Sequence, residues 1–171
     1  MTFNLRSIKQ RMRHQRPKMR RFLTKLEKRN PKQLDQIVEG VGKTVWKEIN
    51  CLACANCCKT MTPTYTQKDM RRIANHLDMS VAAFKQKWLY KDKSGDWMNV
   101  KQPCQFLLKD NTCSIYAVRP RDCSGFPYLT IKMVDYVHVH KQNVEYCPAT
   151  FTMVEKIEKL WKEKLSSKKY P

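Results

Sequence analysis

The sequence has no long hydrophobic run and few acidic residues. No apolar stretch approaches the roughly 20 residues that a membrane-spanning helix needs, so we expect no transmembrane segment. Asp and Glu number 15 against 34 Lys and Arg, which gives a formal net charge of +19. A field of that sign favours nucleic acid, anionic membranes or acidic proteins as partners.

The first residues also lack the continuous apolar core of a secretory signal peptide. They lead instead into a basic amphipathic segment, so we expect a cytoplasmic protein whose cysteines do not form disulfides. The Arg-rich, acid-poor start leaves an organellar transit peptide as an alternative. A chain of 171 residues can bury a real core, so the cysteines are not needed as a substitute for one.

Eight cysteines are present, and half of them fall within eight residues. The dense group comprises Cys51, Cys54, Cys57 and Cys58, and the single cysteines are Cys104, Cys113, Cys123 and Cys147. Two overlapping C-x2-C units allow three thiolates of one segment to converge on a tetrahedral metal ion or an iron–sulfur cluster. Metal binding is therefore the leading interpretation, and disulfides or free, redox-active thiols are the alternatives.

The number and spacing of the cysteines suggest two centres. Adjacent residues generally project in different directions, so we expect Cys57 and Cys58 to serve different sites. The first site would combine Cys51, Cys54 and Cys57 with Cys147, because C-x2-C-x2-C with a remote Cys-Pro is a ferredoxin spacing and favours iron–sulfur over zinc. The second would combine the other four cysteines, and a single centre is the alternative.

Residues 1–32 are predicted to form a basic helical arm. Twelve cations face only Glu27 there: Arg6, Lys9, Arg11, Arg13, Arg16, Lys18, Arg20, Arg21, Lys25, Lys28, Arg29 and Lys32. Apolar residues recur at helical spacing on both sides of Pro17, which predicts two short amphipathic helices. This arm would either pack its apolar stripe on the domain or contact RNA, the ribosome or another polyanion.

Residues 33–165 are predicted to form a metal-binding domain, followed by a basic tail over 166–171. Helix starts are indicated by Asn30-Pro31, by a capping box from Thr66 to Asp69, and by Ser80. A final helix is outlined by residues 151–161 and is expected to end in Lys168, Lys169 and Tyr170. A Gly-Lys-Thr triplet at 42–44 lacks the other features of a phosphate loop and is not interpreted as one.

Strands are expected in the second half of the chain. Residues 104–108 and 113–116 flank a polar turn, which predicts a hairpin that brings Cys104 and Cys113 together. Residues 129–140 alternate as a strand would, with His138 and His140 on one face, where they would be solvated or ligate a metal. The expected fold class is α+β: a small helix-rich domain with a short β-hairpin and cysteine-rich metal-binding loops, preceded by the basic helical arm.

Two motifs together resemble a known family. The cluster C-x2-C-x2-C-C at 51–58 is followed by Tyr-x2-Arg-Pro-x2-Cys-x2-Phe-Pro, formed by Tyr116, Arg119, Pro120, Cys123, Phe126 and Pro127. This combination is similar to the CxxCxxCC, or YkgJ-type, family of zinc- or iron-chelating domains, over about residues 51 to 147. The resemblance implies that all eight cysteines are candidate metal ligands. One departure is Ser124, where the family often has Arg; Arg119 or Arg121 is a candidate substitute.

Three functions follow as hypotheses. The first is a cysteine-cluster protein that binds zinc or an iron–sulfur cluster, in one or two centres. The second is a basic protein associated with RNA or the ribosome, in which the metal is structural. The third is a thiol or iron–sulfur redox enzyme that uses Cys57 and Cys58 as a vicinal pair. The sequence leaves open whether any reaction is catalysed, which metal binds, and the oligomeric state.

Overall fold

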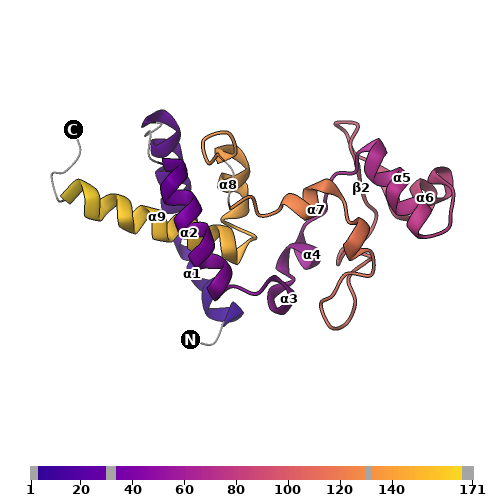
Figure 1. Cartoon of the computed structure of the whole chain (residues 1–171), viewed down its shortest axis with the longest axis horizontal. Coiled ribbons are helices and arrows are strands. Elements are labelled where there is room, and N and C mark those ends of the chain that lie inside the picture. The colour runs from indigo at the N-terminus through magenta and orange to yellow at the C-terminus, as the bar shows by residue number, and fades with distance from the viewer. Residues whose placement is uncertain (1–3, 30–33, 130–131, 167–171) are drawn as a thin grey trace. The chain divides into compact units, whose positions relative to one another are not determined.

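The computed structural model describes residues 4–29, 34–129 and 132–166. It is helix-rich with one short antiparallel sheet, so the predicted fold class is confirmed (Figure 1). The chain forms two compact units, one from residues 1–50 and 127–171 and one from residues 51–126. We call them the helical unit and the cysteine unit. The predicted division at residues 32 and 165 differs from this grouping and stays a prediction.

Among its described residues, the helical unit contains four helices: α1 (Leu5–Arg29), α2 (Leu34–Glu48), α8 (Val137–Asn143) and α9 (Pro148–Ser166). Helix α9 packs against α1 and α2, and α8 packs against α1. Their buried side chains include Leu23 of α1, Val38 of α2 and Phe151 of α9. No described helix is apolar over the length that crossing a bilayer requires.

Helix α1 continues through Pro17, so the prediction of two short helices was wrong. Proline removes one backbone donor and disturbs one turn of a helix. Here the apolar stripe is buried on both sides of that turn, by Met12 before it and by Met19, Phe22 and Leu23 after it. Burying a large apolar side chain contributes about 1.5–3 kcal/mol, so several together outweigh the cost of one proline.

Ion pairs join α1 and α2 to the C-terminal part of the same unit. Arg16 contacts Glu145 at 2.7 Å, Lys141 contacts Glu27 at 2.6 Å, and Lys156 contacts Glu48 at 2.9 Å. These side chains are partly exposed, so each pair contributes only about 0–1 kcal/mol. They select the register of helices that apolar burial already holds together.

Helix α2 confirms the helix expected after Asn30-Pro31, although those two residues lie outside the described ones. Gly42 is buried within it, and a Cβ atom at this position would stand 2.8 Å from the backbone oxygen of Leu129. Real Cβ atoms do not approach that closely, so the glycine permits contact between α2 and the 129 segment. A packing role thus accounts for this residue of the Gly-Lys-Thr triplet.

The strand predicted over 129–140 was wrong for the residues that the structure describes, because 133–136 form turns and helix α8 follows, while residues 130 and 131 lie outside the described ones. The buried positions are Met133, Val137, His140, Val144 and Cys147, which recur every three or four residues. The short segment 136–140 fits both a period of two and a helical period, and packing selects the helix. As a result His140 is buried while His138 is exposed, and the two do not share a face.

The cysteine unit consists of short elements. Its helices are α3 (Cys51–Cys54), α4 (Asn56–Thr60), α5 (Gln67–His76), α6 (Val81–Trp88), the 3-10 helix η1 (Tyr116–Val118) and α7 (Arg121–Gly125). Strands β1 (Leu89–Lys91) and β2 (Trp97–Asn99) pair in antiparallel register, with Leu89 opposite Asn99. The helix starts at Thr66 and Ser80 are confirmed, and Thr66 and Asp69 form the expected capping box.

A small aromatic and aliphatic core holds α5, α6 and the 104–116 segment together. Phe84 of α6 lies between Tyr65 and Phe106, with ring centroids 6.1 and 6.4 Å away, and Trp88 also contacts Phe106. Met70 and Ile73 of α5 complete this core. The cysteine-bearing segments extend from it.

Candidate metal centre

The dense cysteine group folds as two successive helical turns, α3 and α4. Ala55 joins them in a left-handed conformation with φ of 44°, which is uncommon for a residue other than glycine. Its amide donates a 2.7 Å hydrogen bond to the carbonyl of Cys51. The reversal at Ala55 changes the direction of the chain between Cys54 and Cys57, so the cysteines do not follow one regular helix.

Cys57 and Cys58 have their sulfur atoms 3.9 Å apart. Their side chains thus converge, although adjacent residues generally project in different directions, and the assignment of Cys57 and Cys58 to different sites stays a prediction. Two thiolates bound to one zinc ion at about 2.3 Å, with tetrahedral angles, stand about 3.8 Å apart. The observed separation fits two ligands of one mononuclear site.

The loop that carries Cys104 and Cys113 is attached directly to the cluster. The amide of Cys104 donates to the carbonyl of Cys58 at 2.8 Å. Leu107 and Cys113 form an isolated antiparallel bridge, so the predicted hairpin is present as a bridged turn and not as two full strands. The backbone therefore holds Cys104 beside Cys58 and returns Cys113 toward the same region.

Helix α7 carries Cys123 and is held by two carboxylates. Asp122 accepts hydrogen bonds from the backbone amide of Thr64, at 3.0 Å, and from its hydroxyl. Asp69 accepts from the amide of Arg121 at 3.1 Å and from the guanidinium of Arg72 at 2.7 Å. These contacts join the segment after the cysteine cluster to the segment that contains Cys123, and their partners are 52 and 58 residues apart along the chain.

Asn99, at the end of β2, holds the other side of the site. Its amide side chain lies 3.4 Å from the sulfur of Cys104 and its oxygen accepts a 2.6 Å hydrogen bond from the Tyr65 hydroxyl. Gln105 also donates to that oxygen, and the Asn99 backbone amide donates to Thr62. Asn99 is buried, so this bonded side chain fixes the position of Cys104.

The thiols of this region influence one another electrostatically. Burial raises the pKa of Cys51, Cys104, Cys113 and Cys123, to about 12 for Cys123, and in each case a charge on Cys58 raises it further. The pKa of Cys58 itself is raised, first by its contact with the Cys57 thiol and then by burial. Cys58 is thus the thiol common to all these interactions, and all five are protonated at neutral pH without a metal.

The thiol side chains are of the kind that binds a soft metal, but they are not arranged around a metal position in this structure. Sulfur ligands select zinc, copper(I) or iron–sulfur clusters over hard cations. All eight cysteines are among the described residues, and none forms a disulfide. Within that same part of the chain, no three Cys, His, Asp or Glu side chains stand in the arrangement of a closed metal site. Ligation of the cysteines by a metal therefore stays a prediction.

Cys147 belongs to the helical unit, where it is buried at the start of α9. The amide of Thr150 lies 3.5 Å from its sulfur. The set of Cys51, Cys54, Cys57 and Cys147 spans the two units and stays a prediction. The second set, Cys58 with Cys104, Cys113 and Cys123, lies wholly within the cysteine unit.

The second motif also folds locally as one piece. Tyr116 begins η1, and the guanidinium carbon of Arg119 lies 3.8 Å from the centroid of the Tyr116 ring. Pro120 precedes α7, and Phe126 follows it. Ser124, in the position where the resemblance implies Arg, donates a hydrogen bond to the carbonyl of Arg121 at 2.9 Å. The motif thus places Cys123 on one helical turn between an arginine–tyrosine stack and Phe126.

Sequence reasoning missed the residues that position the thiols. Asp122 and Asn99 carry no motif of their own, and their partners are 58 and 34 residues away along the chain. The only local signal was that Asp122 adjoins Cys123 and that Asn99 ends a segment rich in aromatic residues. Long-range hydrogen bonds of this kind become visible only in the folded chain.

Comparison with known families supports the same region. Residues 50–149 match the CxxCxxCC family model, described as "Putative zinc- or iron-chelating domain". No curated protein and no solved structure matches the chain significantly. The matched segment covers more than half of the 171 residues and contains all eight cysteines. The description supports metal binding, and on the extent of this match the chain belongs to the CxxCxxCC family.

Proposed function

We propose that the protein binds a metal through cysteine thiolates of the cysteine unit, with Cys58, Cys104, Cys113 and Cys123 as the minimal ligand set. The observation that carries the proposal is that hydrogen bonds tie together the three segments that carry these four thiols. The Cys104 amide donates to the Cys58 carbonyl at 2.8 Å, the chain returns from Leu107 to Cys113 through a β-bridge, and Asp122, next to Cys123, accepts from the Thr64 amide at 3.0 Å. Family membership points the same way.

A bound cation would reverse the electrostatics of this region. Without metal, burial and mutual repulsion keep the thiols protonated. A divalent metal supplies the positive charge that stabilises several thiolates together, so binding releases protons and links the segments covalently. The ligand loops would then be ordered by the metal as well as by Asn99 and Asp122.

The metal is zinc or iron, and two features favour different answers. Four thiolates that all belong to the cysteine unit suit one ion, as in a tetrahedral zinc site. The C-x2-C-x2-C spacing with a remote Cys-Pro suits an iron–sulfur cluster. Anaerobic purification with metal analysis and a visible spectrum distinguishes them, because iron–sulfur clusters absorb visible light and zinc does not.

The ligand set is tested by single Cys→Ser variants. Replacing Cys58, Cys104, Cys113 or Cys123 should each remove most of the metal from anaerobically purified protein. Ser124→Ala is the matched control, since Ser124 adjoins Cys123 but carries no thiol, and it should keep full metal content. A protein that binds no metal under these conditions, or one whose four variants all retain it, would contradict the proposal.

A nucleophilic cysteine needs a lowered pKa, because the thiolate is the reactive form. The pKa of Cys58 is raised by its contact with Cys57 and by burial, so Cys58 is a poor candidate for the nucleophile of a metal-free thiol enzyme.

A further inference from the structure

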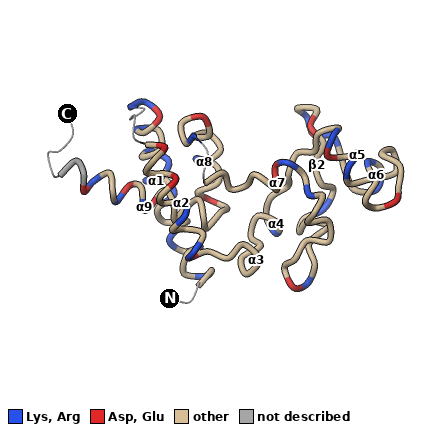
Figure 2. Tube along the Cα trace, in the orientation of Figure 1, with Lys and Arg blue, Asp and Glu red and all other residues tan. Residues whose placement is uncertain are grey.

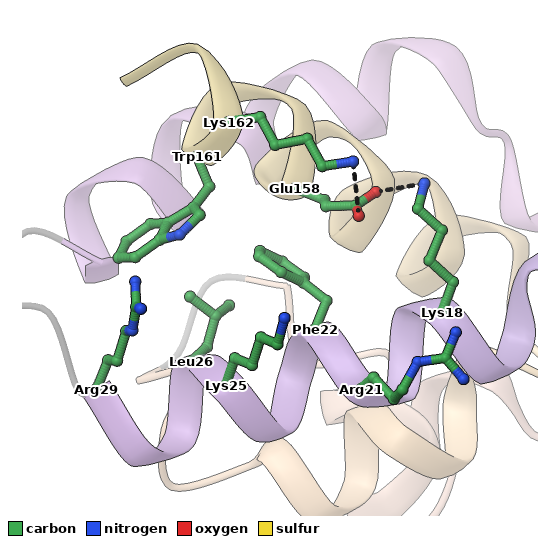
Figure 3. A pocket seen from close by; sticks show the side chains of 9 residues that line it. All are labelled: Lys18, Arg21, Phe22, Lys25, Leu26, Arg29, Glu158, Trp161 and Lys162. Carbon is green, nitrogen blue, oxygen red and sulfur yellow. Dashed lines mark ion pairs between the residues drawn. The ribbon is translucent and has the colours of Figure 1, made fainter. Parts of the chain in front are cut away.

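A hollow of about 370 Å³ lies between α1 and α9 of the helical unit, far along the chain from the cysteine motifs. Its apolar lining comes from Phe22 and Leu26 of α1 and from Trp161 of α9, as Figure 3 shows. Phe22 and Leu26 are buried, whereas Trp161 is half-buried and keeps part of its ring accessible. The volume is within the range of known ligand sites, which begins at about 300 Å³.

The rim of this hollow is strongly basic. Glu158 is its only acidic lining residue among those described, and it is engaged by Lys18 at 2.8 Å and by Lys162 at 3.1 Å (Figure 3). Burial pushes the pKa of Glu158 upward, but the two ammonium groups outweigh that effect and hold it below its usual range. Glu158 therefore stays charged and is occupied by Lys18 and Lys162, and its single negative charge offsets only one of the lining cations.

Three cations of the rim remain available. Arg21, Lys25 and Arg29 are exposed, and none forms an ion pair with a carboxylate of the described residues. They recur every four residues, so they lie along one face of α1. Eight residues of helix extend about 12 Å, which is long enough for the three cations to meet more than one phosphate of an extended strand.

A second hollow adjoins the first on α1. It measures about 520 Å³ and shares Arg21 and Lys25 with the first, and its other lining residues are Arg20, Thr24, Lys28 and Lys141. Lys141 is paired with Glu27, whereas Arg20 and Lys28 have no such pair among the described residues. Figure 2 shows the cations distributed along α1. The basic surface is therefore longer than one binding pocket.

We propose that this face of α1 and α9 binds single-stranded nucleic acid. Arg21, Lys25 and Arg29 contact consecutive phosphates, and a base stacks on the accessible part of the Trp161 ring. Proteins that bind single strands combine a positively charged track with aromatic side chains in this way. The accessible aromatic ring distinguishes the site from a purely electrostatic patch, and the two adjoining hollows favour a strand over a single nucleotide.

A membrane surface is a poorer fit to the same residues. An interfacial helix must bury an apolar face in lipid. The apolar stripe of α1 is already covered, and the exposed large apolar side chains among the described residues of this unit are Trp46 and Leu160. Membrane binding is thus kept as an outcome of the test and not as the proposal.

The test measures binding of a fluorescently labelled ten-nucleotide oligouridine RNA to the full-length protein by anisotropy at several salt concentrations. The double variant Arg21→Glu/Lys25→Glu should weaken binding by at least about tenfold. The slope of log affinity against log salt concentration should fall in magnitude by about 1.4, because each lost phosphate contact on a single strand removes about 0.7. The matched control Lys93→Glu/Lys109→Glu makes the same charge change at exposed positions of the cysteine unit and should alter affinity less than about twofold on the same grounds.

The stacking contact is tested separately. Trp161→Ala should weaken RNA binding about tenfold, whereas Trp161→Phe should retain most of it, and Trp46→Ala is the control at an exposed tryptophan of α2. Unchanged metal content and melting temperature would show that these variants fold. The proposal would be overturned if both double variants lost RNA affinity equally. It would also be overturned if inorganic polyphosphate competed as well as RNA does, or if the protein bound phosphatidylserine vesicles with comparable affinity.

Discussion

The two units of this protein are stabilised in different ways. The helical unit buries long apolar stripes, such as Met19, Leu23 and Phe151, and adds ion pairs at its surface. The cysteine unit has short helices and one pair of three-residue strands, and its loops are held by single buried polar groups such as Asn99. Apolar burial therefore dominates in the helical unit, while the loops of the cysteine unit would gain more from a bound metal.

This difference explains why the cysteines are concentrated where they are. Seven of the eight lie in residues 51–126, where regular elements are shortest. A metal that joins several loops contributes most where few apolar contacts compete with the entropy of those loops. We therefore expect perturbations to affect the two units independently.

Metal removal should give the largest effect. Chelation under anaerobic, reducing conditions should expose the backbone amides of the cysteine unit to hydrogen exchange while the helices of the other unit stay protected. Structural zinc contributes on the order of 10 kcal/mol of apparent free energy in small domains. Amide exchange followed by mass spectrometry measures each unit separately. Equal loss of protection in both units would refute the independence of their stabilisation.

Lowering the pH should give the second-largest effect, a loss of stability of the helical unit. His140 is fully buried, and neither of its ring nitrogens has a hydrogen-bond partner among the described residues. Burial, together with the nearby His138, lowers its pKa to about 4 from an ordinary value of about 6.5. The unfolded chain therefore binds a proton that the folded chain does not between these values.

The stability contributed by neutral His140 is thus fully present above pH of about 6.5 and is lost as the pH falls toward about 4. The loss is on the order of 3 kcal/mol. Urea unfolding across this pH range should show a flatter dependence for His140→Leu than for the natural protein. His14→Gln, at an exposed histidine of α1, should keep the natural slope; the same slope in all three proteins would exclude His140 as the cause.

A pair of glycine variants tests the packing of the helical unit. Gly42→Ala places a Cβ 2.8 Å from the Leu129 oxygen, so the backbone must shift, and overpacking of this kind costs about 1–3 kcal/mol. Gly40→Ala has open space around it in the same helix and should stabilise by about 0.5–1 kcal/mol. The urea concentration at the unfolding midpoint should fall for Gly42→Ala and rise for Gly40→Ala. A higher midpoint for Gly42→Ala than for the natural protein would contradict the close contact.

An aspartate pair tests the polar contacts of the cysteine unit. Asp122→Ala removes the hydrogen bonds from Thr64 and should lower the free energy of unfolding by about 1–2 kcal/mol. It should also weaken metal binding 10- to 100-fold, because residues that orient the metal ligands affect affinity by about that factor. Asp110 accepts the same two kinds of bond from Thr112, but only within its own turn. Asp110→Ala should leave metal affinity nearly unchanged in a chelator competition, and equal losses would show that the long-range bond has no special role.

Helix starts could be predicted because their signals are local. Thr66 and Asp69 lie three residues apart, so their reciprocal bonds form within one turn, and Ser80 likewise caps the helix that follows it. The same reasoning failed for residues 129–140, where five alternating residues fit two periods equally well. Only burial of Met133, Val137 and His140 distinguishes the helix from the strand.

The cysteines of the candidate site could be predicted from the sequence, but the residues that hold them in place could not. Cysteine density and the second motif identified the thiols, because metal chemistry restricts which side chains can act as ligands. The close approach of the Cys57 and Cys58 sulfurs, 3.9 Å apart, was not expected from their adjacency, and it became visible only in the folded chain. Asn99 and Asp122 were missed because their hydrogen bonds connect segments far apart in sequence.

The sequence by itself determined the local properties of this protein: its positive charge, the spacing of its thiols, its helix caps and the apolar stripes of its long helices. The tertiary structure decided which stripes are buried, that α1 continues through Pro17, that Gly42 meets Leu129, and that Arg21, Lys25 and Arg29 remain without carboxylate partners among the described residues. Caps and spacing depend on residues within one turn of each other. Burial, close approach and charge pairing depend on atoms that only the folded chain brings together.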